Sequence, residues 1–340
     1  MKVTTEMQLT LKFRIVFGLA LFMMPLAGCG GSNSPDGALP SAPVGATEAA
    51  ASAKSGSKKI GAVLPMFSHP FFVSQKQGLE EKAKELGFEI DIRDGQDDDT
   101  KQINQVEALL QKGIDLLILC PRDSEALVPA VEMANKANVP VITLNRAVNG
   151  GKVVTYVGAD DTAGGTSQGE ALVKALGTKG GKMIYLQGTQ GSSPQRSRKA
   201  GLDKVLSGHK EITIVDDRYA DFQEDKAKSV MTDLVRKYKP GEIQAIVAQA
   251  DEMAVPAAEV ARAEGWKELV VIGFNGNRDG FDAIKSGSMT ATVLQDAAVQ
   301  GRLSVEAAKE FFDGKTLEKL IYTELPVVDK SNIDKYKPAY

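Results

Sequence analysis

The chain has 340 residues, of which 43% are hydrophobic and 25% are charged, and its formal net charge is -3. This length exceeds one ordinary hydrophobic core and is sufficient for two lobes. The near-neutral charge and the lack of a basic tract argue against nucleic acid as a partner.

The first residues are predicted to be an export signal that is not part of the fold. An apolar run over residues 15–26 follows three basic residues and is too short to span a bilayer comfortably. Directly behind it, Leu26-Ala-Gly-Cys29 resembles the bacterial lipobox, in which the cysteine is acylated and becomes the new N-terminus. We therefore predict a lipoprotein signal peptide over residues 1–28 and lipidation of Cys29. An ordinary signal peptide with a chance cysteine is the alternative.

Residues 29–57 are predicted to be a flexible tether. They consist mainly of Gly, Ser, Ala and Pro and contain almost no large apolar residue, so they cannot bury enough surface to become ordered. Such a tether would lift the folded part of the chain off a membrane. Cys120 is the only cysteine besides Cys29, so no internal disulfide is expected beside an acylated Cys29.

The folded region is predicted to open with a strand, an aromatic-rich loop and a helix. Residues 60–64 form a short apolar run, and Pro65 and Pro70 interrupt regular structure on either side of a polar turn. Apolar residues at helical spacing follow, and Gly87 is a natural stop. In open α/β sheets the loops at the carboxyl ends of strands bind ligands. The loop carries Met66, Phe67, His69, Phe71 and Phe72. One of the last two rings is expected to fill the core, and the other can be a platform for a flat ligand.

Predicted strands and helices then alternate along the chain as far as about residue 275. Two stretches, 114–146 and 243–275, follow the same order of strand, polar loop, helix, strand and polar pair. Alternation of this kind predicts parallel sheets with right-handed crossovers in two lobes whose loops face one cleft. The strands are expected near residues 114–120, 139–144, 153–158, 182–186, 212–215, 243–248 and 269–273, and the helices near 100–110, 125–137, 166–176, from 196 onward, 227–238 and 253–264.

Signals for catalysis, cofactors and metals are weak. The chain has only His69 and His209, and it contains no paired-cysteine, HExxH or GxSxG motif. A glycine-rich run at 164–169 lacks the lysine of a phosphate loop, and Asp97 to Asp99 are more typical of a helix cap than of a cation site. We therefore expect no enzyme activity, no cofactor and no metal site. Arg146 and Arg196 stand at strand-to-helix junctions, where either ligand contacts or surface salt bridges would explain them.

From about residue 58 to about residue 329, the chain resembles the ribose-binding branch of the type I periplasmic binding proteins of ABC transporters. The stretches that carry the resemblance are specific and occur in order. They are His69-Pro-Phe-Phe72, Pro140-Val-Ile-Thr-Leu-Asn-Arg146, Leu186-Gln-Gly, Ala220-Asp-Phe222, Ala248-Gln-Ala-Asp-Glu-Met-Ala254, Gly273-Phe-Asn-Gly276 and Thr292-Val-Leu-Gln295.

The resemblance implies two Rossmann-like lobes, joined by three crossing segments, that close over a sugar. It places the crossings near residues 159–161, 295–296 and 324–327. The lobes are then expected to comprise 58–160 with 296–325, and 161–295 with 326–340.

The resemblance also implies a set of ligand-binding residues. Phe72, Phe222 and Phe274 would sandwich the sugar, Arg146 and Arg196 would donate to its oxygens, and Gln295 would supply a hinge amide. Aromatic faces suit the C–H groups of a sugar ring, and planar arginine forks suit paired oxygens. The further candidate positions are His69, Phe71, Asn145, Ala250 and Asn275.

Four of these positions depart from the ribose-binding pattern. Ribose binders carry Asn at His69, Asp at Asn145, Asn at Ala250 and Asp at Asn275. Two amides thus replace two carboxylates, which we expect to add hydrogen-bond donors to the pocket and remove acceptors. This favours a ligand richer in acceptors than ribose, such as a sugar acid, a carbonyl-bearing or a phosphorylated sugar. A neutral pentose or hexose held by the amides is the alternative.

The sequence therefore predicts a monomeric, lipid-anchored periplasmic receptor that captures a sugar or sugar derivative and hands it to an ABC permease. A sensor subunit feeding a chemoreceptor or kinase would use the same fold and remains open. A transcriptional repressor with this core would need a DNA-binding helix-turn-helix where the signal peptide and tether stand. A sugar-modifying enzyme would need an acid/base or metal set, which the sequence does not offer.

Overall fold

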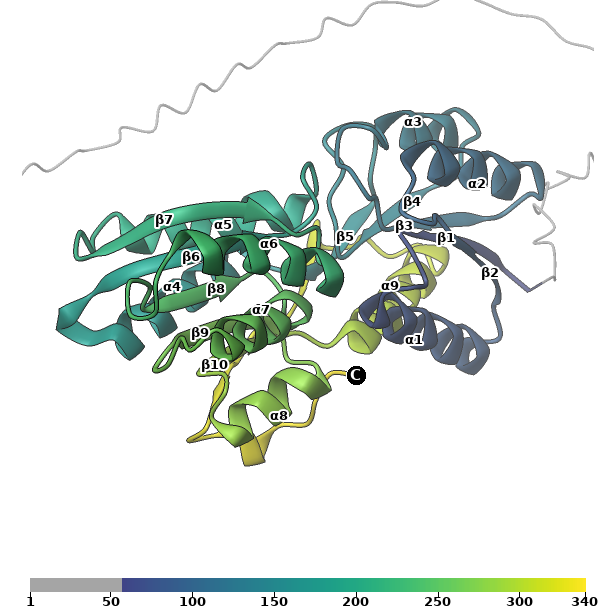
Figure 1. The fold of residues 1–340 in the computed structure, drawn as a ribbon. Helices are drawn as coiled ribbons and strands as arrows, with labels where there is room; N and C mark the ends of the chain where they lie inside the picture. The colour runs from purple at the N-terminus through teal and green to yellow at the C-terminus, as the bar shows by residue number, and fades with distance from the viewer. Residues whose placement is uncertain (1–56) are drawn as a thin grey trace, which may run out of the picture. The chain divides into compact units, whose positions relative to one another are not determined.

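Two six-stranded sheets form the framework of the protein over residues 57–340, the part of the chain that the computed structural model describes (Figure 1). The predicted signal peptide, Cys29 and all but the last residue of the predicted tether lie outside the described residues. The strands of the first sheet are β1 (Lys59–Leu64), β2 (Glu89–Asp94), β3 (Leu116–Leu119), β4 (Val141–Leu144), β5 (Thr155–Ala159) and β11 (Leu320–Thr323). Those of the second are β6 (Gly181–Gln187), β7 (Ile212–Tyr219), β8 (Ala245–Ala248), β9 (Val270–Asn275), β10 (Ala291–Leu294) and β12 (Val327–Asp329).

Both sheets have the same doubly wound order. The first runs β11-β5-β4-β3-β1-β2 and the second β12-β10-β9-β8-β6-β7. All strand pairs are parallel except β10 with β12. In each sheet the winding reverses next to the first strand, and ligands bind beyond the carboxyl ends of strands at such switch points. The predicted α/β fold of two parallel-sheet lobes is confirmed.

Helices cover both faces of each sheet (Figure 1). In the first lobe, α1 (Pro70–Leu86) and α9 (Ala297–Phe312) pack on the face that carries Leu64, while α2 (Asp99–Gln111) and α3 (Val128–Lys136) pack on the face that carries Val63. In the second lobe, α4 (Asp161–Leu176) and α5 (Ser193–Leu206) pack on the face of Tyr185, and α6 (Glu224–Lys237), α7 (Asp251–Ala263) and α8 (Arg278–Ser286) on the face of Leu186. Short 3-10 turns lie at Gly177–Lys179 and Ile333–Lys335.

The chain passes from one sheet to the other three times: between β5 and α4, between β10 and α9, and between β11 and β12. The residues at these passages are 160, 295–296 and 324–326. The sheet membership supports the predicted lobe boundaries, which remain a prediction. Each passage lies beside the carboxyl ends of the parallel strands, where a ligand would bind.

Glycines let one helix pair in each lobe approach closely. A Cβ added at Gly78 of α1 would overlap the carbonyl oxygen of Ala298 of α9. A Cβ at Gly165 of α4 would likewise overlap the carbonyl oxygen of Arg198 of α5. Because backbone atoms cannot move aside as a flexible side chain can, these contacts require glycine.

Several local predictions were wrong. The expected loop through Phe72 ends at His69, because Pro70 takes the first turn of α1 and His69 caps it. Asp98 rather than Thr100 caps α2, and its side chain accepts a hydrogen bond from Lys101 N at 2.7 Å. Helix α5 begins at Ser193, before the predicted start at Arg196.

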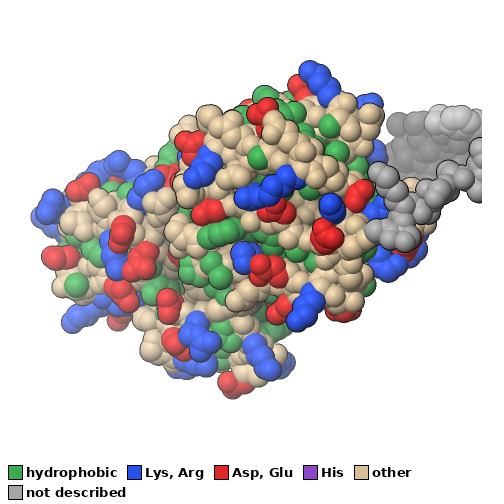
Figure 2. All heavy atoms as spheres, turned by 90° about the vertical axis from the view of Figure 1, so that its right-hand side faces the viewer, with side chains coloured by type: hydrophobic (Ala, Val, Ile, Leu, Met, Phe, Trp, Pro, Cys, Tyr) green, Lys and Arg blue, Asp and Glu red, His purple; other side chains and the backbone are tan. Residues whose placement is uncertain are grey.

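Helix length and surface charge bear on the class of partner. Within residues 57–340, no helix has the length and apolar character needed to cross a bilayer. On the face drawn in Figure 2, acidic and basic side chains are interspersed, and no basic patch gathers on it.

Candidate ligand-binding site

A narrow cavity of about 20 Å³ lies between the two lobes. Its walls come from segments that follow the carboxyl ends of strands in both sheets, as the switch-point geometry requires. The lining residues are Met66, His69, Phe71, Phe72, Asn145, Arg146, Pro194, Arg198, Phe222, Asn275 and Gln295.

Most of the predicted site residues meet at this cavity, although they are far apart in sequence. His69, Phe71, Phe72, Asn145, Arg146, Phe222, Asn275 and Gln295 all line it. Three predicted residues, Arg196, Ala250 and Phe274, do not. Sequence reasoning proposed neither Arg198 nor Pro194 as a site residue.

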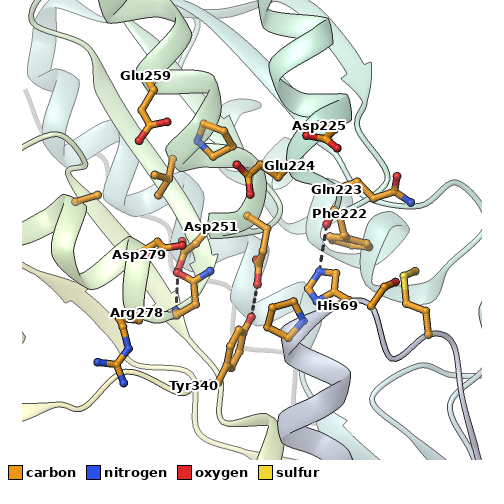
Figure 3. A pocket seen from close by; sticks show the side chains of 18 of the residues that line it. His69, Phe222, Gln223, Glu224, Asp225, Asp251, Glu259, Arg278, Asp279 and Tyr340 are labelled. Carbon is orange, nitrogen blue, oxygen red and sulfur yellow. Dashed lines mark hydrogen bonds between the residues drawn. The ribbon is translucent and has the colours of Figure 1, made fainter. Parts of the chain in front are cut away.

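His69 joins the two lobes directly. Its Nδ1 accepts a hydrogen bond from Phe71 N at 3.2 Å, so its Nε2 carries the proton and donates to the carbonyl oxygen of Phe222 at 3.1 Å. Figure 3 shows the imidazole turned toward Phe222. Burial lowers the pKa of His69, and the charge of Arg146 lowers it further. Both hydrogen bonds therefore belong to a neutral imidazole.

Arg146 packs against the rings of two phenylalanines. Its guanidinium carbon is 5.3 Å from the ring centre of Phe72 and 5.6 Å from that of Phe222. One terminal nitrogen donates to the carbonyl oxygen of Arg122 at 3.2 Å, while the buried Nε has no partner among the described residues. Burial lowers the pKa of Arg146. A buried donor of this kind is costly unless it binds an acceptor, so the geometry favours an oxygen-bearing ligand here.

Arg198, and not Arg196, is the second arginine that lines the cavity. Its Nε donates to Asp161 Oδ1 at 2.8 Å, and its NH1 donates to the carbonyl oxygen of Gln249 at 2.6 Å. Arg196 is exposed and donates to the carbonyl oxygen of Gly191. Residues two apart on a helix point to different faces, so Arg198 lines the cavity while the predicted Arg196 does not. The sequence contained a signal for this position. Arg198 lies one helical turn before Leu202, an apolar residue that is buried, so the two share one face of the helix.

Phe274 and Ala250 lie behind the cavity wall. Phe274 is fully buried, and the guanidinium carbon of Arg198 is 3.5 Å from its ring centre. It therefore supports an arginine of the site, whereas the sequence placed it against the sugar. Ala250 is also fully buried and immediately precedes α7.

Three cavity residues have positive φ angles that side chains rarely adopt. The values are 61° at Asn145, 60° at Phe222 and 101° at Asn275. Asparagine tolerates this region better than most residues, but a bulky phenylalanine does not. Strain of this kind is held where the surrounding structure imposes it, and it clusters at ligand sites.

The two asparagines each turn an amide nitrogen away from the cavity. Asn145 Nδ2 donates to Gln300 Oε1 at 3.1 Å, and Asn275 Nδ2 donates to Glu252 Oε2 at 2.9 Å. Each amide nitrogen carries a second N–H group, so the expectation that the amides add donors to the pocket stays a prediction. Neither Gln300 nor Glu252 was a candidate residue.

The periplasmic binding protein domain model matches residues 60–316. The chain belongs to this family. The periplasmic binding protein family acts outside the cytoplasm, which places this protein there as well. Among residues 57–340, no cluster of three or more His, Cys, Asp or Glu side chains could hold a metal ion.

Relatives of this periplasmic binding protein are named as binding proteins. The ribose import binding protein RbsB of Bacillus subtilis is 39% identical over 274 residues, which cover 80% of this chain and 88% of that protein. The structure is also similar to an ABC transporter solute-binding protein of Mycobacterium smegmatis with bound glycerol, with a TM-score of 0.79 and 32% identity, covering 82% of this chain and 96% of that one. A fructose-binding periplasmic domain of a hybrid two-component system has a TM-score of 0.77 and 25% identity, covering 82% of this chain and 92% of that domain.

Proposed function

We propose that the protein captures a sugar or sugar derivative in the interlobe cavity and delivers it to an ABC permease without changing it chemically. The observation that carries the proposal is the position of Phe72, Phe222, Arg146 and Arg198 around one cavity that both lobes line. The similarity to a ribose import binding protein supports the same ligand class.

The chemistry of the cavity walls suits a sugar. The faces of a sugar ring present C–H groups, which pack well on phenylalanine rings. Its hydroxyl and ring oxygens match the planar guanidinium groups, which donate several hydrogen bonds in fixed directions. The free Nε of Arg146 would then donate to a ligand oxygen.

The ligand can be identified by a thermal-shift screen of the purified protein with D-ribose, D-fructose, myo-inositol, D-allose and the corresponding sugar acids. At least one of them should raise the melting temperature, because a ligand that binds only the folded state stabilises it. Calorimetry then gives its dissociation constant, and chromatography should recover it unchanged. If none stabilises the protein, the proposed ligand class is wrong.

Delivery needs a test in cells. Uptake of the labelled ligand should fall when the gene for this protein is deleted and should return with the wild-type gene. An Arg198→Ala gene should restore it poorly. Full uptake in the deletion strain would contradict the transport role.

We also propose that Cys29 carries the lipid anchor, which rests on the sequence Leu26-Ala-Gly-Cys29. Replacing Cys29 with Ala should move the protein from the membrane fraction to the soluble extracytoplasmic fraction. Equal incorporation of a labelled fatty acid by both variants would show that the anchor is elsewhere.

Sensing is a second candidate function, since one structural relative is a periplasmic domain of a two-component system. A sensor role predicts that the ligand changes gene expression or chemotaxis in cells that lack the permease. A response that requires the permease would favour transport alone.

A further inference from the structure

A chain of side-chain hydrogen bonds connects the two asparagines of the cavity. Asn145 Nδ2 donates to Gln300 Oε1 at 3.1 Å, and Gln300 Nε2 donates to Gln295 Oε1 at 3.2 Å. Gln295 Nε2 donates to Asn275 Oδ1 at 2.7 Å, and Asn275 Nδ2 donates to Glu252 Oε2 at 2.9 Å. We call these five residues the amide relay. It starts in the first lobe, passes a crossing segment at Gln295 and ends in the second lobe.

The amide relay has one direction. Each amide donates with its nitrogen to the oxygen of the next member, and the last acceptor is a carboxylate. An ionised carboxylate can only accept hydrogen bonds, whereas an amide can turn round and do either. Glu252 is therefore the only member whose chemistry fixes the direction. A further amide, Gln75, donates to Gln300 Oε1 at 3.4 Å and supports the same orientation from outside the amide relay.

A second hydrogen bond holds Glu252 in place. The hydroxyl of Tyr340 donates to its other oxygen, Oε1, as the dashed line from Tyr340 in Figure 3 marks. The ring of Tyr340 in turn packs edge-on against Phe71 of the first lobe, with ring centres 5.9 Å apart. Both oxygens of Glu252 thus accept hydrogen bonds. Tyr340, which donates one of them, contacts the opposite lobe through Phe71.

The direction of the amide relay decides what Asn145 offers to a ligand. Its nitrogen is turned to the fully buried Gln300, which does not line the cavity, and its Oδ1 accepts no hydrogen bond from residues 57–340. Asn145 lines the cavity, so this oxygen is the acceptor that its side chain can offer there. Asn145 thereby keeps an acceptor where the ribose-binding pattern has a carboxylate.

We propose that Glu252 is a positioning residue that sets ligand specificity: through the amide relay it makes Asn145 a hydrogen-bond acceptor, which selects a ligand with a hydroxyl donor at that point. Glu252 does not line the cavity, but it lines a wider neighbouring pocket that shares Met66, His69 and Phe222 with it. The inference rests on the proposed sugar-binding function for its ligand, but the amide relay can be tested without a ligand.

The ligand-free test uses the variant Glu252→Gln. A glutamine can donate to Asn275, which allows each amide in turn to reverse as far as Asn145. Spectra of the side-chain amide groups in the ¹⁵N-labelled protein should therefore show shifted resonances for all four amides, including Asn145 at the far end. The matched control is Glu259→Gln, because Glu259 lies on the same helix, is exposed and takes no part in the amide relay (Figure 3). An Asn145 resonance that does not move in Glu252→Gln would overturn the proposal.

The specificity test compares dissociation constants for D-ribose, D-ribonate and 2-deoxy-D-ribose. In Glu252→Gln the ratios among the three should change by about tenfold, which corresponds to one exchanged hydrogen bond. Glu252→Asp, which retains an acceptor-only group, should preserve the wild-type ratios even if all three bind more weakly. Uniform weakening by Glu252→Gln would indicate a merely structural role and would contradict the inference. If the wild type binds none of the three, the same comparison is made with the sugar that stabilises the protein most, its acid and its deoxy form, and the amide resonances decide the amide relay in either case.

Discussion

The hydrogen bond that His69 Nδ1 accepts from Phe71 N requires the neutral imidazole, which makes ligand capture sensitive to pH. Burial lowers the pKa of His69 from its ordinary value, with Arg146 acting in the same direction and Glu252 and Asp97 acting against it. In the open or unfolded state the imidazole regains its ordinary pKa of about 6.5. The stabilisation of the closed form is therefore complete above that value and is lost as the pH falls toward the lowered pKa.

We predict that ligand affinity decreases between about pH 7 and about pH 5, the range that spans the ordinary pKa of histidine. The variant His69→Asn should show a flatter profile, because asparagine is a good helix cap and does not titrate. Calorimetry at a series of pH values measures both profiles. The same slope in the variant and the wild type would assign the pH dependence to another group.

Arg198 and Arg196 provide a matched pair for testing the site. Lysine in place of Arg198 would keep the charge opposite Asp161 but would lose the planar fork and the stacking on Phe274. We predict that Arg198→Lys weakens binding about 10- to 100-fold, the scale of a hydrogen bond to a charged group. Arg196→Lys should change the dissociation constant by no more than about twofold, as is usual for an exposed site. Equal effects of the two substitutions would restore Arg196 as the ligand contact.

Single residues show where sequence reasoning succeeds and where it fails. His69, Phe72, Arg146 and Phe222 were predictable because short motifs fix them at the ends of strands. Arg198 was missed because its role depends on the helical register, which follows from the start of α5 at Ser193. The role of Glu252 could not be predicted from the sequence, because its hydrogen bonds join it to Asn275 and Tyr340, which are 23 and 88 positions away.

At the scale of elements, the close contact of α4 with α5 holds Arg198 in position. A Cβ at Gly165 would overlap the carbonyl oxygen of Arg198, so the two helices would have to move apart. We predict that Gly165→Ala lowers the free energy of unfolding by about 1–3 kcal/mol, the usual effect of overpacking. It should weaken ligand binding as well, because it displaces the turn that carries Arg198. Urea unfolding and calorimetry measure the two effects.

Gly208→Ala is the control for this substitution. A Cβ at Gly208 would lie 3.6 Å from the carbonyl oxygen of Val205, which is an ordinary contact. Its free energy of unfolding should stay within about 0.5 kcal/mol of the wild type. If Gly165→Ala had the free energy of unfolding of the wild type, the two helices could move apart without destabilising the protein, which would contradict the prediction.

Most strands and helices were predictable because buried parallel strands are continuous apolar runs between amphipathic helices. Strand β2 was missed, since Glu89–Asp94 alternates charged and apolar residues at the edge of its sheet and has no fully buried position. The start of α1 was misplaced because Pro70 was interpreted as an interruption, whereas proline is favoured in the first turn of a helix.

At the scale of the whole described region, the two lobes repeat one strand order and meet at one cavity. The internal repeat of strand, loop and helix predicted two similar lobes, and the family resemblance predicted the three crossings. The sequence could not predict the contacts that close the cavity, such as His69 to Phe222 and Phe71 to Tyr340. These contacts span the lobes, so they exist only when the lobes are close together.

The central claim is that the protein closes its two lobes around a sugar, since contacts from both lobes would favour the closed state when the ligand is bound. Small-angle X-ray scattering of the purified protein, titrated with the sugar that stabilises it most, tests this claim most directly. We predict that the radius of gyration decreases and saturates at the ligand concentration given by calorimetry. The Phe222→Ala variant should need more ligand to reach the same state. A scattering curve that remains unchanged at saturating ligand would contradict the account.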